Sequence, residues 1–279
     1  MSYLTTRDKV RLYYKDWGAG RPVVLLHGWP LSSDTFDELA LTLAQSGFRT
    51  IAYDRRGFGR SDQPWGGYDY DSLADDLADV IEQTGVTNAA LLGFSMGGGE
   101  VVRYLSRHAG RNVAQALLVS SVVPYLLKDA TNPEGVDASV FQQMSEGITA
   151  DRAGFWATFF KQFYGIGLLP GPVPMEVVEW SRTLAMQASL RATLECASAF
   201  ATTDFRGDLP AVTVPTLVIH GNKDETVPID VSGRRAAALI AGATFIEYDG
   251  GPHGLLASHK ERLATDVVAF LRGARQPAG

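Results

Sequence analysis

The sequence predicts an α/β fold in which a mostly parallel, doubly wound sheet carries an inserted helical cap. The first observation behind this prediction is that short apolar runs alternate with segments of helical periodicity along most of the chain. Such an alternation is typical of parallel strands that the connecting helices bury on both faces. The second observation is the connection between residues 123 and 216, which is far too long for one crossover helix.

Six apolar runs, rich in branched side chains, are expected to form the buried strands. Each run is followed directly by Gly, Ser, His or Asp, and the runs are residues 23–26, 50–53, 89–92, 116–119, 216–219 and 244–248. Ahead of the first run, residues 3–6 and 11–16 are expected to pair as an antiparallel hairpin at the edge of the sheet.

The covering helices are predicted from apolar residues spaced by three and four positions. One begins after Ser33, a typical N-cap residue, and stops at Gly47. Other helical stretches are residues 73–81, which Gly85 closes, 138–146, 151–164, 175–201 and 263–271. We therefore expect a core formed by residues 1–123 and 212–279, and a mostly helical cap formed by residues 124–211.

Composition narrows the classes of function. The 279 residues are 46% hydrophobic and 20% charged, with a net charge of −6, so the chain is expected to be globular and to repel nucleic acid. No segment has the pattern of a signal peptide or a membrane span, which favours a cytoplasmic protein. The single Cys196 has no cysteine or histidine at a metal-ligand spacing, so it is interpreted as a buried structural thiol, and no metal is expected.

A Gly-Phe-Ser-Met-Gly sequence at 93–97 carries the strongest chemical signal. An apolar run precedes it and a helical segment follows, and in a strand–turn–helix this pattern is typical of a nucleophilic serine. The serine is expected in a strained turn, so its neighbours need to be very small. We interpret Ser95 as the nucleophile; the alternative is a glycine-rich turn with a capping serine.

A serine nucleophile needs a base, and His253 is the best placed of five histidines. It follows the last predicted strand, at the carboxyl edge of the sheet where such sheets bind ligands. His108 and His259 are interpreted as capping or solvated residues. His27 is expected to shape the loop after the first buried strand, and His220 is interpreted as structural.

Asp224 is the expected orienting acid, because it follows the penultimate strand at the same edge. Glu225 is adjacent, but its side chain would point elsewhere if Asp224 faces the histidine. Asp54 lies in an arginine-rich loop ahead of the serine and is expected to hold that loop together by ion pairing. The acid, base and nucleophile are therefore predicted to be Asp224, His253 and Ser95.

An oxyanion would need two backbone donors. We expect the amides of Met96, directly after the serine, and of Trp29, because Pro30 has no N–H to donate. Aromatic residues of the cap exceed what one helix face needs, so part of the surplus is expected to line a substrate pocket; the alternative is that they only pack the cap. The expected pocket residues are Trp29, Pro30, Phe159, Phe163, Phe200 and Val227.

Taken together, these motifs resemble a known family. They are His-Gly-Trp-Pro at 27–30, the stretch 54–62, Gly-Phe-Ser-Met-Gly-Gly-Gly at 93–99 and Gly-Pro-His-Gly at 251–254. The chain is similar along its whole length to the bacterial cofactor-free haloperoxidases, also described as aryl esterases and perhydrolases of the α/β-hydrolase superfamily. It departs from the His-Gly-Gly-Gly loop of many lipases, which argues against a lipase-type enzyme.

The resemblance implies the α/β-hydrolase fold and hydrolysis of small carboxylic esters without cofactor or metal. It also implies that hydrogen peroxide turns a carboxylic acid into a peracid, which then oxidises halide. A proline after the oxyanion tryptophan, here Pro30, is typical of the members classed as chloroperoxidases. Homo-oligomers are a further implication. A lactonase, an amidase or a γ-lactamase would keep the same three residues, and a slow-turnover receptor for a small ligand is the alternative from another class.

Overall fold

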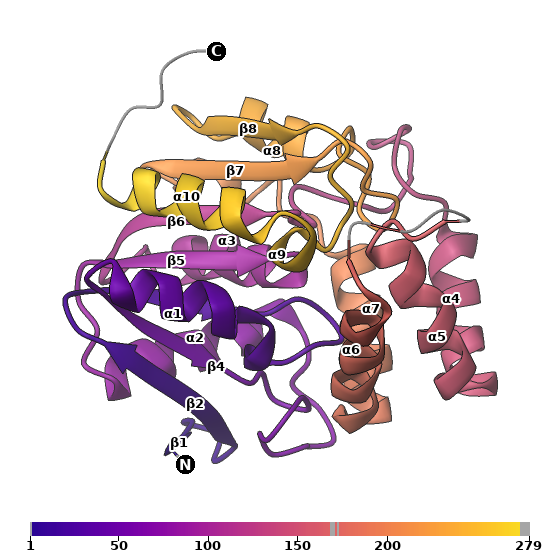
Figure 1. Ribbon diagram of the computed structural model, residues 1–279, viewed down its shortest axis with the longest axis horizontal. Helices are drawn as coiled ribbons and strands as arrows, with labels where there is room; N and C mark the ends of the chain where they lie inside the picture. The colour runs from indigo at the N-terminus through magenta and orange to yellow at the C-terminus, as the bar shows by residue number, and fades with distance from the viewer. Residues whose placement is uncertain (1, 168–170, 172, 274–279) are drawn as a thin grey trace.

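The computed structural model describes residues 2–167, 171 and 173–273. Their strands form one eight-stranded sheet in the order β1-β2-β4-β3-β5-β6-β7-β8 (Figure 1). Strand β2 runs antiparallel to both of its neighbours, β1 and β4, and all pairs from β4 onwards are parallel. The strands are β1 (Ser2–Thr5), β2 (Arg11–Gly18), β3 (Arg21–Leu26), β4 (Phe48–Tyr53), β5 (Ala89–Phe94), β6 (Val113–Val119), β7 (Thr216–Gly221) and β8 (Thr244–Tyr248).

The helices surround this sheet and extend beyond one end of it. They are α1 (Asp37–Gln45), α2 (Tyr70–Gln83), α3 (Met96–Arg107), α4 (Ala138–Ala150), α5 (Arg152–Phe163), α6 (Met175–Gln187), α7 (Leu190–Thr202), α8 (Gly233–Leu239), α9 (Leu255–Ser258) and α10 (Lys260–Leu271), with short 3-10 helices η1 (Ser33–Phe36) and η2 (Leu209–Ala211). No helix among the described residues is both long and apolar enough to span a bilayer.

Three layers make up the core. Helices α1 and α10 cover one face of the sheet, while α2 and α3 cover the other, and the strands point toward the end where α4 to α7 lie (Figure 1). Strands β5 and β7 are buried along their whole length and β3 from Val23 to Leu26, as expected for a parallel sheet covered on both faces. The four helices of the β6–β7 connection therefore lie over the carboxyl ends of the strands.

The predicted α/β fold is confirmed: all six apolar runs form strands, and the edge hairpin is present. The burial expected for residues 244–248 is wrong, because β8 is the outermost strand of the sheet and only Tyr248 in it is buried. Helices α4 to α7 occupy the predicted cap, in which residues 168–170 and 172 lie outside the described residues; the division into core and cap units stays a prediction. The single helix expected over residues 175–201 is wrong. Ala188 is extended, and the Ser189 side chain caps a new helix by accepting from the Ala192 amide. Helix α8, a short run of Arg and Ala, was not predicted.

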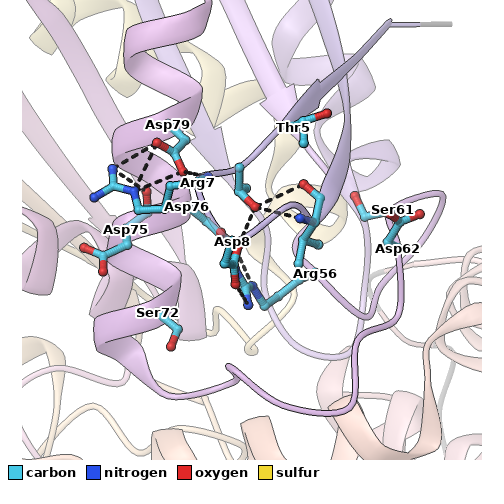
Figure 2. A network of polar contacts seen from close by, with 12 residues as sticks. Thr5, Arg7, Asp8, Arg56, Ser61, Asp62, Ser72, Asp75, Asp76 and Asp79 are labelled. Atoms are coloured by element: carbon cyan, nitrogen blue, oxygen red, sulfur yellow. Dashed lines mark hydrogen bonds and ion pairs between the residues drawn. The ribbon is translucent and has the colours of Figure 1, made fainter.

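A network of ion pairs fixes the β1–β2 turn to helix α2 (Figure 2). The guanidinium of Arg56 bonds both oxygens of Asp76 at 2.6 Å and lies 2.9 Å from Asp8. Arg7 pairs with Asp79 at 2.9 Å. Arg56 and Asp76 are both buried, so this network ties the antiparallel edge of the sheet to the helix layer.

A second ion pair lies in the interior, between Arg55 after β4 and Glu100 in α3. Both side chains are 1% exposed. Glu100 also accepts a hydrogen bond from the Tyr53 hydroxyl at 2.8 Å, and Arg55 donates to the carbonyl of His27 at 2.6 Å. The pair thus joins helix α3 to the loop that follows β3. Removing one partner of a buried ion pair lowers the free energy of unfolding far more than removing one partner of an exposed pair, because the remaining charge stays buried.

Replacing Glu100 with leucine is expected to lower the free energy of unfolding by about 3–5 kcal/mol, because the Arg55 charge would stay buried without its partner. Urea denaturation followed by circular dichroism measures the change. The control is Glu179→Ala, which removes the exposed pair with Arg182 and should cost less than about 1 kcal/mol. Equal losses in both variants would contradict the argument.

Candidate active site

The order in which the chain adds strands to the sheet reverses at β3. From β3 the chain passes to β4 on one side, and β5 then pairs with β3 on the other. Such a switch point opens a crevice at the carboxyl ends of the strands, where open α/β sheets bind their ligands. Trp29 follows β3 and Ser95 follows β5, while Asp224 and His253 follow β7 and β8 at the same edge.

Ser95 occupies a sharp turn between β5 and α3. Its backbone has φ 54° and ψ −118°, a sparsely populated region that is costly for a residue other than glycine. The turn is possible because the residues two positions before and after Ser95 are glycines: a Cβ at Gly93 would collide with the Gly97 carbonyl, and one at Gly97 with the Leu26 carbonyl. The hydroxyl is therefore held at the N-terminus of α3, above the strand ends.

Three side chains meet at this point. His253 Nε2 lies 2.9 Å from Ser95 Oγ, and His253 Nδ1 lies 2.6 Å from Asp224 Oδ2. All three residues are at most 6% exposed. The His253 ring packs against Phe94 and edge-on against Phe163, with centroids 5.3 and 4.7 Å away. One ring nitrogen thus faces the hydroxyl while the other faces the carboxylate.

Asp224 is held as a carboxylate. Burial opposes its ionisation, but the attraction of His253 and the hydrogen bonds from His220 and His253 keep the pKa of Asp224 well below its ordinary value. Its Oδ1 accepts from the amides of Thr226 and Val227 at 2.9 and 2.7 Å. A charged acceptor is the form that can orient the His253 ring and stabilise its protonated state.

Among the described residues, two backbone amides near Ser95, those of Met96 and Trp29, have no acceptor. Met96 opens α3, so its N–H is one of those without an acceptor inside the helix. Trp29 follows Gly28, which lies so close to Ser95 that a Cβ added at Gly28 would be 3.2 Å from Ser95 Cβ. The Trp29 amide has no acceptor among the described residues. The Trp29 indole is anchored by donating to the Thr193 carbonyl at 2.9 Å. The two amides therefore remain the candidates for the donors that an oxyanion needs.

Buried polar contacts of His27 and Asp54 fix the loop that carries Trp29. Burial and the Arg55 guanidinium lower the pKa of His27 to about 3, so its ring is neutral and its Nε2 accepts from the Arg55 amide at 3.0 Å. Asp54 pairs with Arg60 at 2.8 Å and accepts from the Ser33 hydroxyl at 2.6 Å. The prediction that His27 shapes the loop after β3 is confirmed. The prediction that Asp54 holds its own loop, residues 54–62, by pairing with an arginine is confirmed too.

A cavity of about 450 Å³ lies over Ser95 and His253. Its wall is mostly apolar and comes from the strand ends and from α4, α5 and α7. The lining residues are Trp29, Ser95, Val122, Leu126, Val136, Val140, Phe141, Gln143, Met144, Phe155, Thr158, Phe159, Gln162, Phe200, Glu225, Thr226, Val227, Pro228 and His253. Four of the predicted pocket residues are among them: Trp29, Phe159, Phe200 and Val227.

Pro30 and Phe163 do not line this cavity. Pro30 is buried in the turn after Trp29, and Phe163 lies between the His253 ring and a separate cavity beside α6. Sequence reasoning also missed the wall from residues 122–144. A bridge between Leu127 and Val136 folds that segment back over the strand ends, and only the apolar periodicity of α4 hints at it.

The remaining candidates lie apart from the reacting atoms, with one exception. His108 caps α3 and lies 2.8 Å from Asp75, and His259 lies between α9 and α10. Burial raises the pKa of Cys196 to about 12, which agrees with a structural thiol. The exception is His220, whose Nε2 lies 3.0 Å from Asp224 Oδ2. Among the described residues, no group of three or more His, Cys, Asp or Glu side chains could hold a metal ion.

Comparison with known proteins gives the class. A family model described as the alpha/beta hydrolase fold matches residues 21–260. The chain therefore belongs to the α/β-hydrolase fold family, which the order of strands and the turn at Ser95 had already indicated.

Relatives within that family narrow the group. The chain is 42% identical to a non-heme chloroperoxidase of Streptomyces lividans and 40% identical to a bifunctional esterase/perhydrolase of Acinetobacter calcoaceticus, covering 98% of this chain and 100% of each relative. A bromoperoxidase from Bacillus anthracis superposes with a TM-score of 0.93 at 39% identity, covering 97% of this chain and 100% of that one. The chain belongs with the non-heme haloperoxidases and esterase/perhydrolases.

Proposed function

We propose that the protein hydrolyses small carboxylic esters through an acyl-enzyme on Ser95, and that it forms peracids when hydrogen peroxide replaces water. The observation that carries this proposal is the alignment of Ser95, His253 and Asp224 at 2.9 and 2.6 Å beneath an apolar cavity. The relatives named as a chloroperoxidase and an esterase/perhydrolase support it.

In the acylation step, His253 Nε2 removes the Ser95 proton as Oγ attacks the ester carbonyl carbon. Asp224 keeps the Nδ1 proton in place and stabilises the imidazolium, while the Trp29 and Met96 amides bind the oxyanion. The imidazolium then gives its proton to the leaving alcohol. Water, or hydrogen peroxide, attacks the acyl-enzyme by the same route and releases the acid, or the peracid.

The pocket favours uncharged acyl groups. Its described lining contains no lysine or arginine, and the one carboxylate in that lining is Glu225. A carboxylate substituent on the substrate would lose hydration without gaining an ionic partner. Small aryl and alkyl esters without charge fit the cavity best. A cytoplasmic location and a homo-oligomeric state stay predictions.

A panel of short aryl and alkyl esters, assayed with and without hydrogen peroxide, tests the proposal. Ester turnover by the wild-type chain should be accompanied by peracid formation from acetate and peroxide, detected by oxidation of bromide. Ser95→Ala serves as the blank for both reactions. Turnover of p-nitrophenyl acetate limited to a few events per hour would instead indicate a ligand receptor.

Pro30→Leu is expected to lower the ratio of perhydrolysis to hydrolysis several-fold, because the proline directs the Trp29 carbonyl toward the attacking water or peroxide. Both rates are measured on the same preparation, so a general loss of activity cancels in the ratio. An unchanged ratio would count against a role of Pro30 in selecting peroxide.

A further inference from the structure

A second histidine faces the carboxylate of Asp224. His220 is the penultimate residue of β7 and is fully buried. Its Nε2 lies 2.9 Å from the carbonyl of Val227 and 3.0 Å from Asp224 Oδ2. A carbonyl can only accept, so Nε2 carries the proton, and this N–H lies within reach of both oxygens. Its Nδ1 has no hydrogen-bond partner among the described residues, which indicates a neutral ring.

Both histidines approach the same oxygen of Asp224. Oδ1 is occupied by the amides of Thr226 and Val227, so it is Oδ2 that faces His253 Nδ1 at 2.6 Å and His220 Nε2 at 3.0 Å. The negative charge that Asp224 presents to His253 is therefore shared with His220. A donor shared in this way fixes the carboxylate and weakens its pull on the other partner.

We propose that His220 is a positioning residue, which holds Asp224 Oδ2 in line with His253 and limits how strongly Asp224 stabilises the protonated His253 ring. The proposal rests on the function proposed for Ser95, His253 and Asp224. His220 does not touch the substrate, and its effect reaches the reaction only through Asp224.

The fold makes room for this ring at a cost. A Cβ at Gly233, at the start of α8, would lie 2.7 Å from His220 Nδ1, so the ring fits because residue 233 is glycine. Burying a ring nitrogen without a partner is unfavourable, and an apolar side chain would avoid that loss. What the histidine provides in return is its Nε2–H, which bonds the Val227 carbonyl and faces Asp224 Oδ2.

Other charged groups near His220 are engaged elsewhere. Glu247 on β8 is its partner in strand register, but that carboxylate bonds Arg234 and Asn222 at the surface. Lys223 and Glu225, on the turn after β7, are exposed. Helix α8 presents Gly233 to the ring. Among the described residues, the titratable group that faces His220 is therefore Asp224, and Asp224 faces both His220 and His253.

His220→Leu removes the shared donor, and two changes are expected. The freed Asp224 oxygen would favour the protonated His253 ring, so the acidic limb of the pH profile of kcat/KM should move to higher pH. A shift of about half a unit is expected, because the donor is shared with the Val227 carbonyl and its loss is worth less than a full hydrogen bond. Looser placement of Asp224 should lower kcat about ten-fold, while KM changes less than about two-fold. His220→Gln keeps an amide donor in the place of Nε2 and should restore both.

A merely structural role predicts a different result. His220→Leu would then lower the melting temperature and the amount of active enzyme, but the pH limb would stay in place, and that outcome overturns the proposal. An equal shift of the limb in the Gln and Leu variants overturns it too.

Gly233→Ala, which pushes on the ring without removing the donor, provides a second route if the Leu variant does not fold. It should move the limb in the same direction by a smaller amount, and an unmoved limb in this variant would contradict the proposal. Labelling of Ser95 by a fluorophosphonate distinguishes a failure of the proposed function from a failure of the role proposed for His220. Failure of wild-type labelling contradicts the proposed function, whereas normal labelling with an unmoved limb contradicts only the role of His220.

Discussion

Ser95→Ala is expected to reduce kcat on p-nitrophenyl acetate at least about 10⁴-fold, leaving only what transition-state binding by the amides contributes. The reason is that no other hydroxyl in the described chain lies at His253 Nε2, which faces Ser95 Oγ at 2.9 Å. Peracid formation should fall by the same factor, because both reactions are proposed to pass through one acyl-enzyme. Steady-state assays on purified protein measure both activities.

The matched control is Ser106→Ala, on the helix that Ser95 precedes and without a hydrogen bond to the proposed machinery. It should retain full activity. The glycines on either side of Ser95 are unaffected by the change, so circular dichroism and melting temperature should also match the wild type. Perhydrolysis that persists in Ser95→Ala while hydrolysis is lost would refute a shared acyl-enzyme.

Asp224→Asn is expected to lower kcat by about 10⁴-fold as well, through the tautomer of His253. The carboxylate accepts the Nδ1 proton at 2.6 Å and thereby leaves Nε2 free to take the Ser95 proton. An amide NH₂ facing Nδ1 would favour the tautomer protonated at Nε2, which cannot act as a base. KM should change little, because Asp224 lies behind His253 and does not line the pocket.

Asp230→Asn is the control, since it neutralises an exposed carboxylate on the same connection between β7 and α8. It should leave kcat within about two-fold of the wild type. A loss in Asp224→Asn of less than about ten-fold would show that another group orients His253. The pH profile of the residual activity, which should rise with hydroxide, distinguishes that case from simple misfolding.

Much of the fold could be predicted because the signals were local. Each strand had branched apolar residues and ended at a small or polar residue. The N-cap predicted at Ser33 is wrong by one position, because Ser32 caps the 3-10 helix η1 and α1 begins only at Asp37. The meeting of Ser95, Asp224 and His253 could also be anticipated, since parallel strands bring their carboxyl ends to one edge. These inferences needed only the chain order and the direction of the strands.

The pocket was harder because it depends on how the β6–β7 connection folds back. Whether Phe159 or Phe163 faces the cavity is decided by the rotation of α5 against His253. The sequence does not specify this rotation, because aromatic residues occur on more than one face of α5. Residues 122–144 were missed for the same reason. The approach of His220 to Asp224 required knowing the turn after β7, although the spacing of four residues was visible.

The burial of Cys196 has a consequence for a protein whose proposed co-substrate is an oxidant. Peroxide attacks sulfur through the thiolate, and a thiol with a pKa near 12 inside α7 is almost wholly protonated at neutral pH. Cys196, the one thiol in the sequence, is thus kept out of reach of the sulfenic acid chemistry that would inactivate an exposed cysteine.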